Sequence, residues 1–140
     1  MRSPTDIALA ELNATSQGNM VGFLGIEYTA IDADYLAAKM PVSQKTQQPI
    51  GWLHGGASVV LAETIGSMAA NLAVDRAQYY CVGLSIHANH MRRVTQGYVY
   101  AVATPLHTGK STQVWQIKIT DEQKQLVCAS QLTVKVLDKR

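Results

Sequence analysis

The stretch QQPIGWLHGGASVVLAETIGSMAA, from Gln47 to Ala70, contains one acidic residue, Glu63, in an otherwise small and apolar run. The glycine pair Gly55–Gly56, followed by Ser58, is typical of the start of a helix. The pattern therefore predicts one long central helix that begins at the glycines. Because its apolar residues point in almost every direction, this helix should be buried within the domain, or between the domain and a partner.

The segments around this helix predict strands and turns. Two strand-like runs flank the turn-forming trio Asp32, Ala33 and Asp34, which predicts a hairpin. A short amphipathic helix is expected over residues 5–15, and a loop over residues 43–53. Four further strands are expected after the long helix, over residues 79–94, 98–107, 111–120 and 126–136. This order predicts a single α+β domain over residues 1–140, an antiparallel sheet wrapped around one long helix.

The composition favours a folded protein without a nucleic-acid or membrane partner. The net charge is +2, and the basic residues are scattered instead of forming a basic groove. The N-terminal segment has an acid at Asp6 and no continuous apolar core, and no run of eighteen apolar residues follows. Cys81 and Cys128 lie far apart in strand-like contexts, which favours buried free thiols in a reducing compartment. A cytoplasmic protein is the simplest expectation.

Glu63 is the residue that needs an explanation. Glu63, Ser67 and Asn71 recur every four residues and predict one polar stripe, and the small residues Gly66 and Ala70 should leave room for something to approach it. A carboxylate in these apolar surroundings is expected to lose much of its hydration. Two interpretations remain open. Glu63 is either a structural acid that reaches solvent or an ion-pair partner, or a catalytic base or nucleophile in a pocket.

The residues upstream favour the catalytic interpretation. His54 and the two glycines stand where free backbone N–H groups and the helix dipole favour negative charge. A site for a developing oxyanion, together with a carboxylate two turns further along, is a minimal apparatus for attack on an acyl group. A thiol with a pKa of about 8.5 can leave the acyl carbon as its thiolate, without strong assistance from an acid. The pattern therefore favours a thioester over an amide as the substrate.

Five stretches of the chain resemble one known family. They are ELNATSQGNMVGFLGIEY, AAKMPVSQKTQQPIGWLHGGASVVLAE, VGLSIHANHMR, PLHTG and QVWQIKI. Their arrangement is similar to that of the hotdog-fold acyl-CoA thioesterases, in the type II 4-hydroxybenzoyl-CoA thioesterase branch. Within this branch, the stretches resemble the 1,4-dihydroxy-2-naphthoyl-CoA thioesterases of menaquinone synthesis and the proofreading thioesterases of enterobactin synthesis. The resemblance implies a hotdog fold and hydrolysis of an aromatic acyl-CoA.

The resemblance also implies roles for individual residues. Glu63 would attack the thioester carbonyl or activate water, and Gly55 would donate its backbone N–H to the carbonyl oxygen. His54 and Gln48 would orient the thioester, and Ser67 would assist the carboxylate or the water. The family's active sites are shared between the subunits of a dimer, and dimers pair into tetramers. The resemblance implies neither a metal nor an organic cofactor.

The CoA part of the substrate is assigned by the same resemblance. Its channel would be lined by Gly83, by the segment His90, Met91, Arg92 and Arg93, and by the loop His107, Thr108, Gly109, Lys110, Ser111 and Thr112. For each charge in this set, an ordinary solvated strand end is an equally good interpretation. A metal site at His87 and His90 is not expected, because a strand turns them to opposite faces. Trp52 and Trp115 are expected to be packing residues, although Trp52 could also touch the acyl group.

Two alternative functions stay open at this point. The enzyme would hydrolyse a carrier-protein-bound aryl thioester or a fatty acyl-CoA, or the chain would be a hotdog protein that binds acyl-CoA without catalysis. A binder would have no need for a carboxylate beside a carbonyl site, so Glu63 favours the enzyme.

Overall fold

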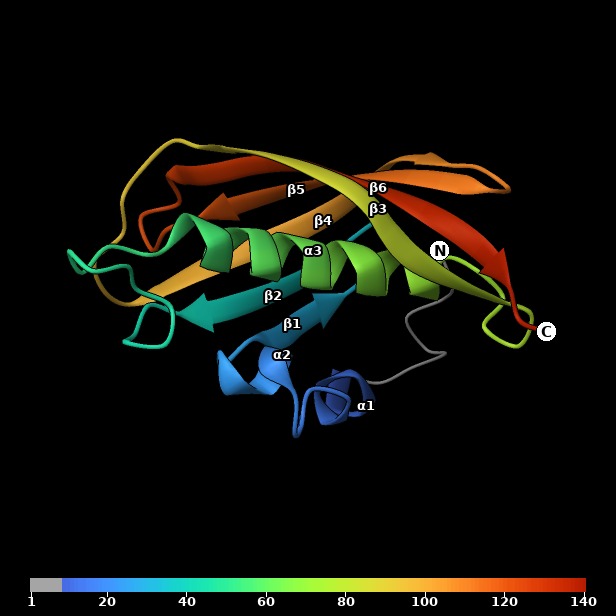
Figure 1. The fold of residues 1–140 in the computed structure, drawn as a ribbon, viewed down its shortest axis with the longest axis horizontal. Coiled ribbons are helices and arrows are strands. Elements are labelled where there is room, and N and C mark those ends of the chain that lie inside the picture. The colour runs from blue at the N-terminus through green and yellow to red at the C-terminus, as the bar shows by residue number, and fades with distance from the viewer. Residues whose placement is uncertain (1–8) are drawn as a thin grey trace.

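The computed structural model describes residues 9–140. Two short helices come first, followed by a hairpin, one long helix and four strands (Figure 1). The elements are α1 (Leu9–Ala14), α2 (Met20–Phe23), β1 (Glu27–Ile31), β2 (Leu36–Pro41), α3 (Gly55–Leu72), β3 (Tyr79–His90), β4 (Tyr98–Thr108), β5 (Thr112–Thr120) and β6 (Leu126–Asp138). The predicted helix over residues 5–15 corresponds to α1, and its residues 5–8 lie outside the described part. The predicted hairpin, long helix and four strands are confirmed.

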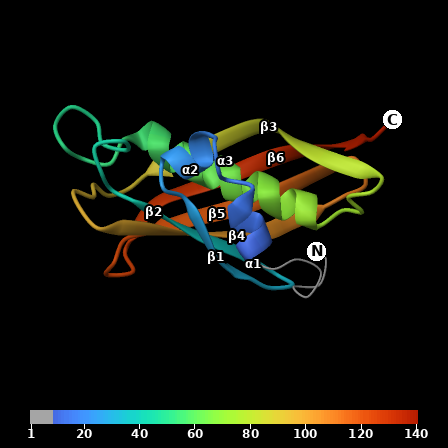
Figure 2. The ribbon, with the colours of Figure 1, turned by 90° about the horizontal axis from the view of Figure 1, so that it is seen from below.

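The strands form one antiparallel sheet in the order β1-β2-β4-β5-β6-β3. The sheet curves around α3 (Figures 1 and 2). The short helices α1 and α2 lie beside β1, at the β1 end of the sheet. Because β3 pairs only with β6 among the described strands, it forms one edge of the sheet. The predicted α+β architecture, an antiparallel sheet wrapped around one long helix, is therefore confirmed.

The core lies between α3 and the concave face of the sheet. Leu61, Ile65 and Ala69 of α3 are fully buried, as are Trp115 of β5 and Leu132 of β6. This arrangement explains the apolar character of α3, since the curved sheet covers much of the helix circumference. It also confirms Trp115 as a packing residue. Its indole N–H donates to Gln113 Oε1 at 2.8 Å, which satisfies the polar atom inside the core.

The expected role of the small residues beside the polar stripe is wrong. A Cβ placed at Gly66 would lie 2.7 Å from Leu132 Cδ2 and 3.1 Å from Ile117 Cδ1. Ala70 is likewise fully buried. These residues therefore allow the sheet to approach α3 closely, and leave no room there for a ligand.

Cys81 and Cys128 are both buried and free, as expected. Burial raises the pKa of both thiols, so both remain protonated at neutral pH. Within residues 9–140, no helix has the length and hydropathy needed to cross a membrane.

Candidate active site

Glu63 lies on α3 and faces β3. A Cβ placed at Gly83 would lie 2.5 Å from Glu63 Oε2, so the absence of a side chain on Gly83 makes room for the carboxylate. Among residues 9–140, Glu63 forms no ion pair. The expectation that the carboxylate loses much of its hydration is wrong for the single chain, where Glu63 is exposed. Only a further molecule, such as a substrate or a second subunit, would shield it from water.

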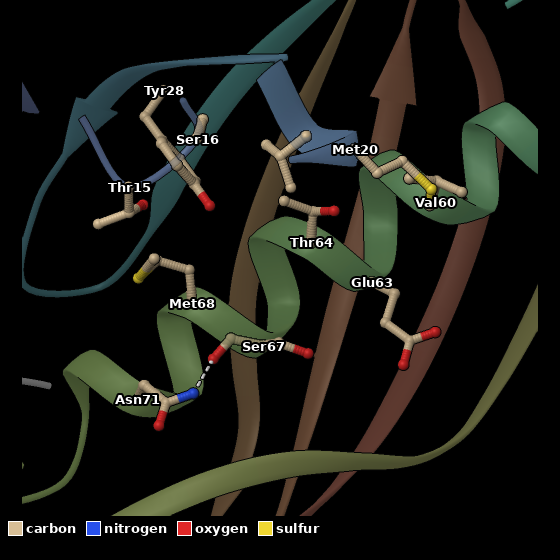
Figure 3. Close-up of a pocket in the computed structure, with 11 residues that line it drawn as sticks. Thr15, Ser16, Met20, Tyr28, Val60, Glu63, Thr64, Ser67, Met68 and Asn71 are labelled. Atoms are coloured by element: carbon tan, nitrogen blue, oxygen red, sulfur yellow. Dashed lines mark hydrogen bonds between the residues drawn. The ribbon is translucent and has the colours of Figure 1, made fainter. Parts of the chain in front are cut away.

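A pocket of about 450 Å³ extends along α3 beside Glu63 (Figure 3). The helix contributes Val60, Thr64 and Met68 to its wall, in addition to Glu63 and Ser67. The opposite wall is formed by Tyr28 of β1 and by the residues between α1 and α2. This pocket brings Glu63 and Ser67 together, as the four-residue spacing predicted.

Asn71, the third residue of the predicted polar stripe, ties α3 to β3. Its Nδ2 donates to the Cys81 carbonyl oxygen at 3.1 Å, and its Oδ1 accepts from the Cys81 N–H at 2.8 Å. Nδ2 also donates to the carbonyl oxygen of Ser67, at 2.8 Å (Figure 3). Asn71 therefore has a structural role, because these bonds hold the strand that carries Gly83 against the helix that carries Glu63.

The N-terminus of α3 leaves one backbone donor available. His54 is the N-cap, and its Nδ1 accepts from the Gly56 N–H at 2.8 Å. A neutral imidazole that accepts at Nδ1 carries its proton on Nε2, so His54 can donate a second hydrogen bond from Nε2. The N–H of Gly55 has no acceptor among residues 9–140. The start of α3 therefore has two donors, the Gly55 N–H and the His54 Nε2–H, at the end of the helix where its dipole favours negative charge.

A second pocket, of about 410 Å³, opens beside this helix N-terminus. It is lined by Gly55 and Ser58 of α3, by Trp52, and by the segment from His90 to Arg93. A Cβ at Gly55 would lie 3.0 Å from His90 Nε2, so the two residues are in close contact. The Arg93 guanidinium lies 5.1 Å from the centroid of the Trp52 ring, a cation–π distance that places positive charge at the pocket.

The two halves of the predicted catalytic set lie apart within one chain. Gly55 and Glu63 are eight residues apart on the same helix, which corresponds to about 12 Å along its axis. They also line different pockets. Within one chain, the carboxylate and the free N–H therefore face separate pockets, and their backbone positions lie about two turns apart.

Gln48 lies in the loop before α3, where its side chain stabilises the local turn. Its Oε1 accepts from the Ile50 N–H at 2.6 Å, and its backbone carbonyl accepts from the Gly51 N–H at 2.9 Å. A bridge between Gln47 and Leu53 closes this loop next to the helix N-terminus. The side-chain amide of Gln48 keeps its N–H groups free, because they have no acceptor among residues 9–140.

The residues predicted to line a CoA channel lie in three places. Gly83 lies against Glu63, and His90 to Arg93 lie beside Gly55. The turn from His107 to Thr112 lies near the opposite end of the sheet, because Thr112 pairs with Lys135 whereas His90 pairs with Cys128. Seven residues of β6 separate these pairing positions, which corresponds to about 24 Å. One chain therefore does not bring the three groups into one channel.

His87 and His90 lie on opposite faces of β3, as the strand periodicity predicts, and they line different pockets. The described residues contain no group of three or more His, Cys, Asp or Glu side chains that could hold a metal ion.

Sequence reasoning missed the part of the site that comes from the N-terminal segment. Tyr28 is only 3% exposed and lines the pocket beside Glu63. The side chain of Asn13 in α1 binds both backbone polar groups of Tyr28. Asn13 Oδ1 accepts from the Tyr28 N–H at 2.8 Å, and Asn13 Nδ2 donates to the Tyr28 carbonyl oxygen at 3.0 Å. The only signals in the sequence were an amide inside a short helix and an aromatic residue in an alternating strand.

The buried phenol of Tyr28 predicts a loss of stability at alkaline pH. Burial raises the pKa of Tyr28 from 10.0 to about 12, so the folded chain holds this proton more tightly than the unfolded chain. The resulting stabilisation is complete below pH 10 and is lost as the pH rises through 12. Between these values, the free energy of unfolding of the wild type should fall by up to about 3 kcal/mol more than that of Tyr28→Phe. Urea unfolding across this range measures the difference, and equal slopes would contradict the prediction.

Several known proteins are similar to this chain over most of its length. A family model described as the thioesterase superfamily matches residues 50–128. The 1,4-dihydroxy-2-naphthoyl-CoA hydrolase of Escherichia coli is 53% identical over 131 residues, which cover 94% of this chain and 96% of that protein. The proofreading thioesterase EntH of Cronobacter turicensis is 50% identical over 131 residues, covering 94% and 95%. A thioesterase structure from Haemophilus influenzae superposes with a TM-score of 0.94 at 46% identity, covering 99% and 96%.

The chain belongs to the thioesterase superfamily and has its hotdog fold. It is a thioester hydrolase, as the central motif and its resemblance predicted.

Proposed function

We propose that this thioesterase hydrolyses aromatic acyl-CoA thioesters, such as 1,4-dihydroxy-2-naphthoyl-CoA or hydroxybenzoyl-CoA, at sites shared between two subunits. The observation that carries the shared site is the separation of about 12 Å between Glu63 and Gly55 along α3. A hydrolase that uses both residues on one carbonyl needs Glu63 from one chain and Gly55 from another. The name of the E. coli relative, a 1,4-dihydroxy-2-naphthoyl-CoA hydrolase, supports a thioester of an aromatic acid.

The reaction would begin with the carbonyl oxygen bound at the start of α3. The Gly55 N–H and the Nε2–H of His54 would stabilise the negative charge that forms on this oxygen. The N–H groups of Gln48, which are free in the single chain, would help to orient the thioester. These donors are fixed by the helix cap, so they need little rearrangement during the reaction.

Glu63 of the other subunit would supply the attacking group. As a general base, it takes a proton from water while the water oxygen bonds to the carbonyl carbon, and the Ser67 hydroxyl assists. The C–S bond then breaks, the electron pair leaves with CoA as thiolate, and the acid product separates. As a nucleophile, the carboxylate would bond to the carbonyl carbon itself and release the same thiolate, and water would then hydrolyse the anhydride. Both routes consume one water molecule.

The edge strand β3 is the surface that would bring two subunits together. It is twelve residues long, and its backbone is unpaired on one side among the described strands. Tyr80, Val82 and Leu84 are exposed on it, with Leu84 61% exposed. Such a long apolar edge favours pairing with a second chain. Gly83 lies on this strand against Glu63, so pairing here would also cover the exposed carboxylate.

The same dimer would assemble the CoA channel from its three separated groups. Arg92, Arg93 and Lys110 would supply positive charge for the phosphates of CoA. We also propose that two dimers form a tetramer, and that the enzyme, with its two buried free thiols, works in the cytoplasm.

The substrate class is tested by kcat/KM measured with benzoyl-, hydroxybenzoyl-, 1,4-dihydroxy-2-naphthoyl- and fatty acyl-CoA thioesters, following the released thiol. We expect the aryl-CoA substrates to exceed the fatty acyl-CoA substrates by about 10-fold or more, because a difference of about 1.4 kcal/mol in transition-state binding suffices for that ratio. A higher value for the fatty acyl substrates would contradict the aromatic assignment. If the enzyme hydrolysed only aryl thioesters bound to a carrier protein, the assigned substrate would be the carrier-protein thioester and not the CoA thioester.

A further inference from the structure

The pocket beside Glu63 has a hydroxyl group in the wall opposite the catalytic helix. Tyr28 is almost fully buried, yet its phenolic oxygen points into the pocket toward α3 (Figure 3). This hydroxyl makes no hydrogen bond to any other residue within 9–140. The mechanism described above does not use it. A polar group in this position needs a partner, and the pocket is where a partner can reach it.

The position of the Tyr28 hydroxyl is fixed by the backbone around it. The Asn13 side chain bonds both the N–H and the carbonyl of Tyr28, at 2.8 and 3.0 Å. A β-bulge between Tyr28 and Ala30 shifts the pairing of β1 with β2 at the same place. Because a bulge re-aims the neighbouring side chains, these contacts set the direction of the ring before any ligand binds.

A second hydroxyl in this wall also lacks a partner. Ser16, just after α1, lines the same pocket and is only 5% exposed. Its Oγ is buried and makes no hydrogen bond within residues 9–140. The chain packs tightly here, since a Cβ at Gly22 of α2 would collide with the Ser16 carbonyl oxygen. The Ser16 Oγ lies beneath the surface of this wall, so the Tyr28 hydroxyl is the group that an occupant of the pocket can reach.

We propose that Tyr28 selects acyl groups that carry a hydroxyl on their distal end. The proposal rests on the proposed function, in which Glu63 meets the thioester carbonyl of an aromatic acyl group. The remainder of the pocket includes the apolar side chains of Val60 and Met68. An apolar ring with one polar substituent fits this lining better than an aliphatic chain does.

The chemistry of the phenol suits the recognition of another hydroxyl. With its pKa near 12, Tyr28 stays protonated at the pH of an assay, so it can both donate and accept a hydrogen bond. A substrate that fills the pocket without a hydroxyl would displace water from the phenol and leave it unpaired. Sites built in this way discriminate strongly against analogues that lack the matching group.

Tyr28→Phe tests the proposal, because it removes the hydroxyl and keeps the ring. The substrates are benzoyl-CoA and its three monohydroxy isomers, with kcat/KM measured for each. In the wild type, we expect at least one hydroxylated isomer to exceed benzoyl-CoA by about 10-fold. In Tyr28→Phe, this ratio should fall to within about 2-fold of unity, because the phenol that distinguishes the substrates is gone.

Tyr100→Phe is the matched control, because Tyr100 lies on β4 and is 38% exposed, outside both pockets. It should leave the ratio unchanged. Three results would each overturn the selection by Tyr28. They are a wild type without a preference, an unchanged ratio in Tyr28→Phe, and an equal loss of kcat/KM on all four substrates in Tyr28→Phe. The last outcome would assign Tyr28 a purely structural role. If the wild type hydrolyses none of the four but does hydrolyse a fatty acyl-CoA, the proposed function fails as well.

Discussion

Glu63→Gln is expected to lower kcat by about 10³-fold or more with an aryl-CoA substrate, because it removes the carboxylate that attacks or activates water. The substitution preserves the size of the side chain and therefore the space above Gly83. Stability should change by no more than about 0.5 kcal/mol, since Glu63 is exposed in the chain and makes no ion pair among residues 9–140. Thiol release and thermal unfolding measure the two effects.

Glu122→Gln is the matched control, since Glu122 is an exposed acid in the turn after β5. It should retain wild-type turnover. Near-normal kcat in Glu63→Gln would exclude both proposed roles of the carboxylate. For the wild type, a single turnover in ¹⁸O-labelled water tests for the nucleophilic role. When water attacks the Glu63 carbon of the anhydride, Glu63 acquires the label and its own oxygen passes to the product. A general base leaves all the label in the product, as does attack of water on the acyl carbon, so label in Glu63 identifies the nucleophile.

Much of the fold follows from local sequence patterns. The Gly55–Gly56 pair and the apolar run after it place α3 correctly, and the Asp32–Asp34 turn places the β1–β2 hairpin. The later strands were predicted because Gly97, Gly109 and a polar stretch punctuate alternating or apolar runs. These features act over a few residues, so a single sequence contains the information needed to read them.

The wall of the pocket formed by Tyr28 depends on contacts that local patterns do not contain. Asn13 and Tyr28 are fifteen residues apart, and their hydrogen bonds leave no periodic trace in the sequence. The short helix α2 begins at an Asn19 N-cap, which accepts from the Val21 N–H at 3.1 Å. With only four residues, α2 is too short to show helical periodicity.

Two expectations about α3 were wrong for a related reason: the room for a ligand beside Gly66 and the loss of hydration at Glu63. Periodicity reveals that Gly66 and Glu63 lie on neighbouring parts of the helix surface, but it does not say what covers them. The sheet covers Gly66, while the described chain leaves Glu63 exposed. A sequence therefore predicts the need to explain an isolated carboxylate, whereas its surroundings depend on tertiary packing and, in our proposal, on a second subunit.

Heterodimers built from two inactive variants are expected to recover activity. The first variant is Gly55→Pro. Proline is tolerated at the first position of a helix, and the preceding His54, with φ −67° and ψ 131°, already has the conformation that a following proline requires. The substitution therefore removes the Gly55 N–H and keeps the helix backbone, while the His90 ring, 3.0 Å from the added Cβ, shifts to make room. It should lower kcat by about 10²–10³-fold. The second variant is Glu63→Gln.

In a heterodimer of these two variants, one site combines the intact Gly55 of one subunit with the intact Glu63 of the other. The second site carries both defects. Heterodimers purified through two different tags should therefore show about half of the wild-type kcat per dimer, far above either parent. If both groups of a site came from one chain, every site would carry a defect and the activity would stay at the parental level.

The same two substitutions placed in one chain provide the decisive control. When the double variant Gly55→Pro, Glu63→Gln is paired with a wild-type subunit, each shared site receives one defective group, so the purified heterodimer should be inactive. Sites contained within one chain would predict the reverse, because the wild-type subunit would keep its own complete site. The two arrangements contain the same residues in the same numbers, so any difference in folding or protein concentration affects both alike. Only the partition of Gly55 and Glu63 between subunits distinguishes them.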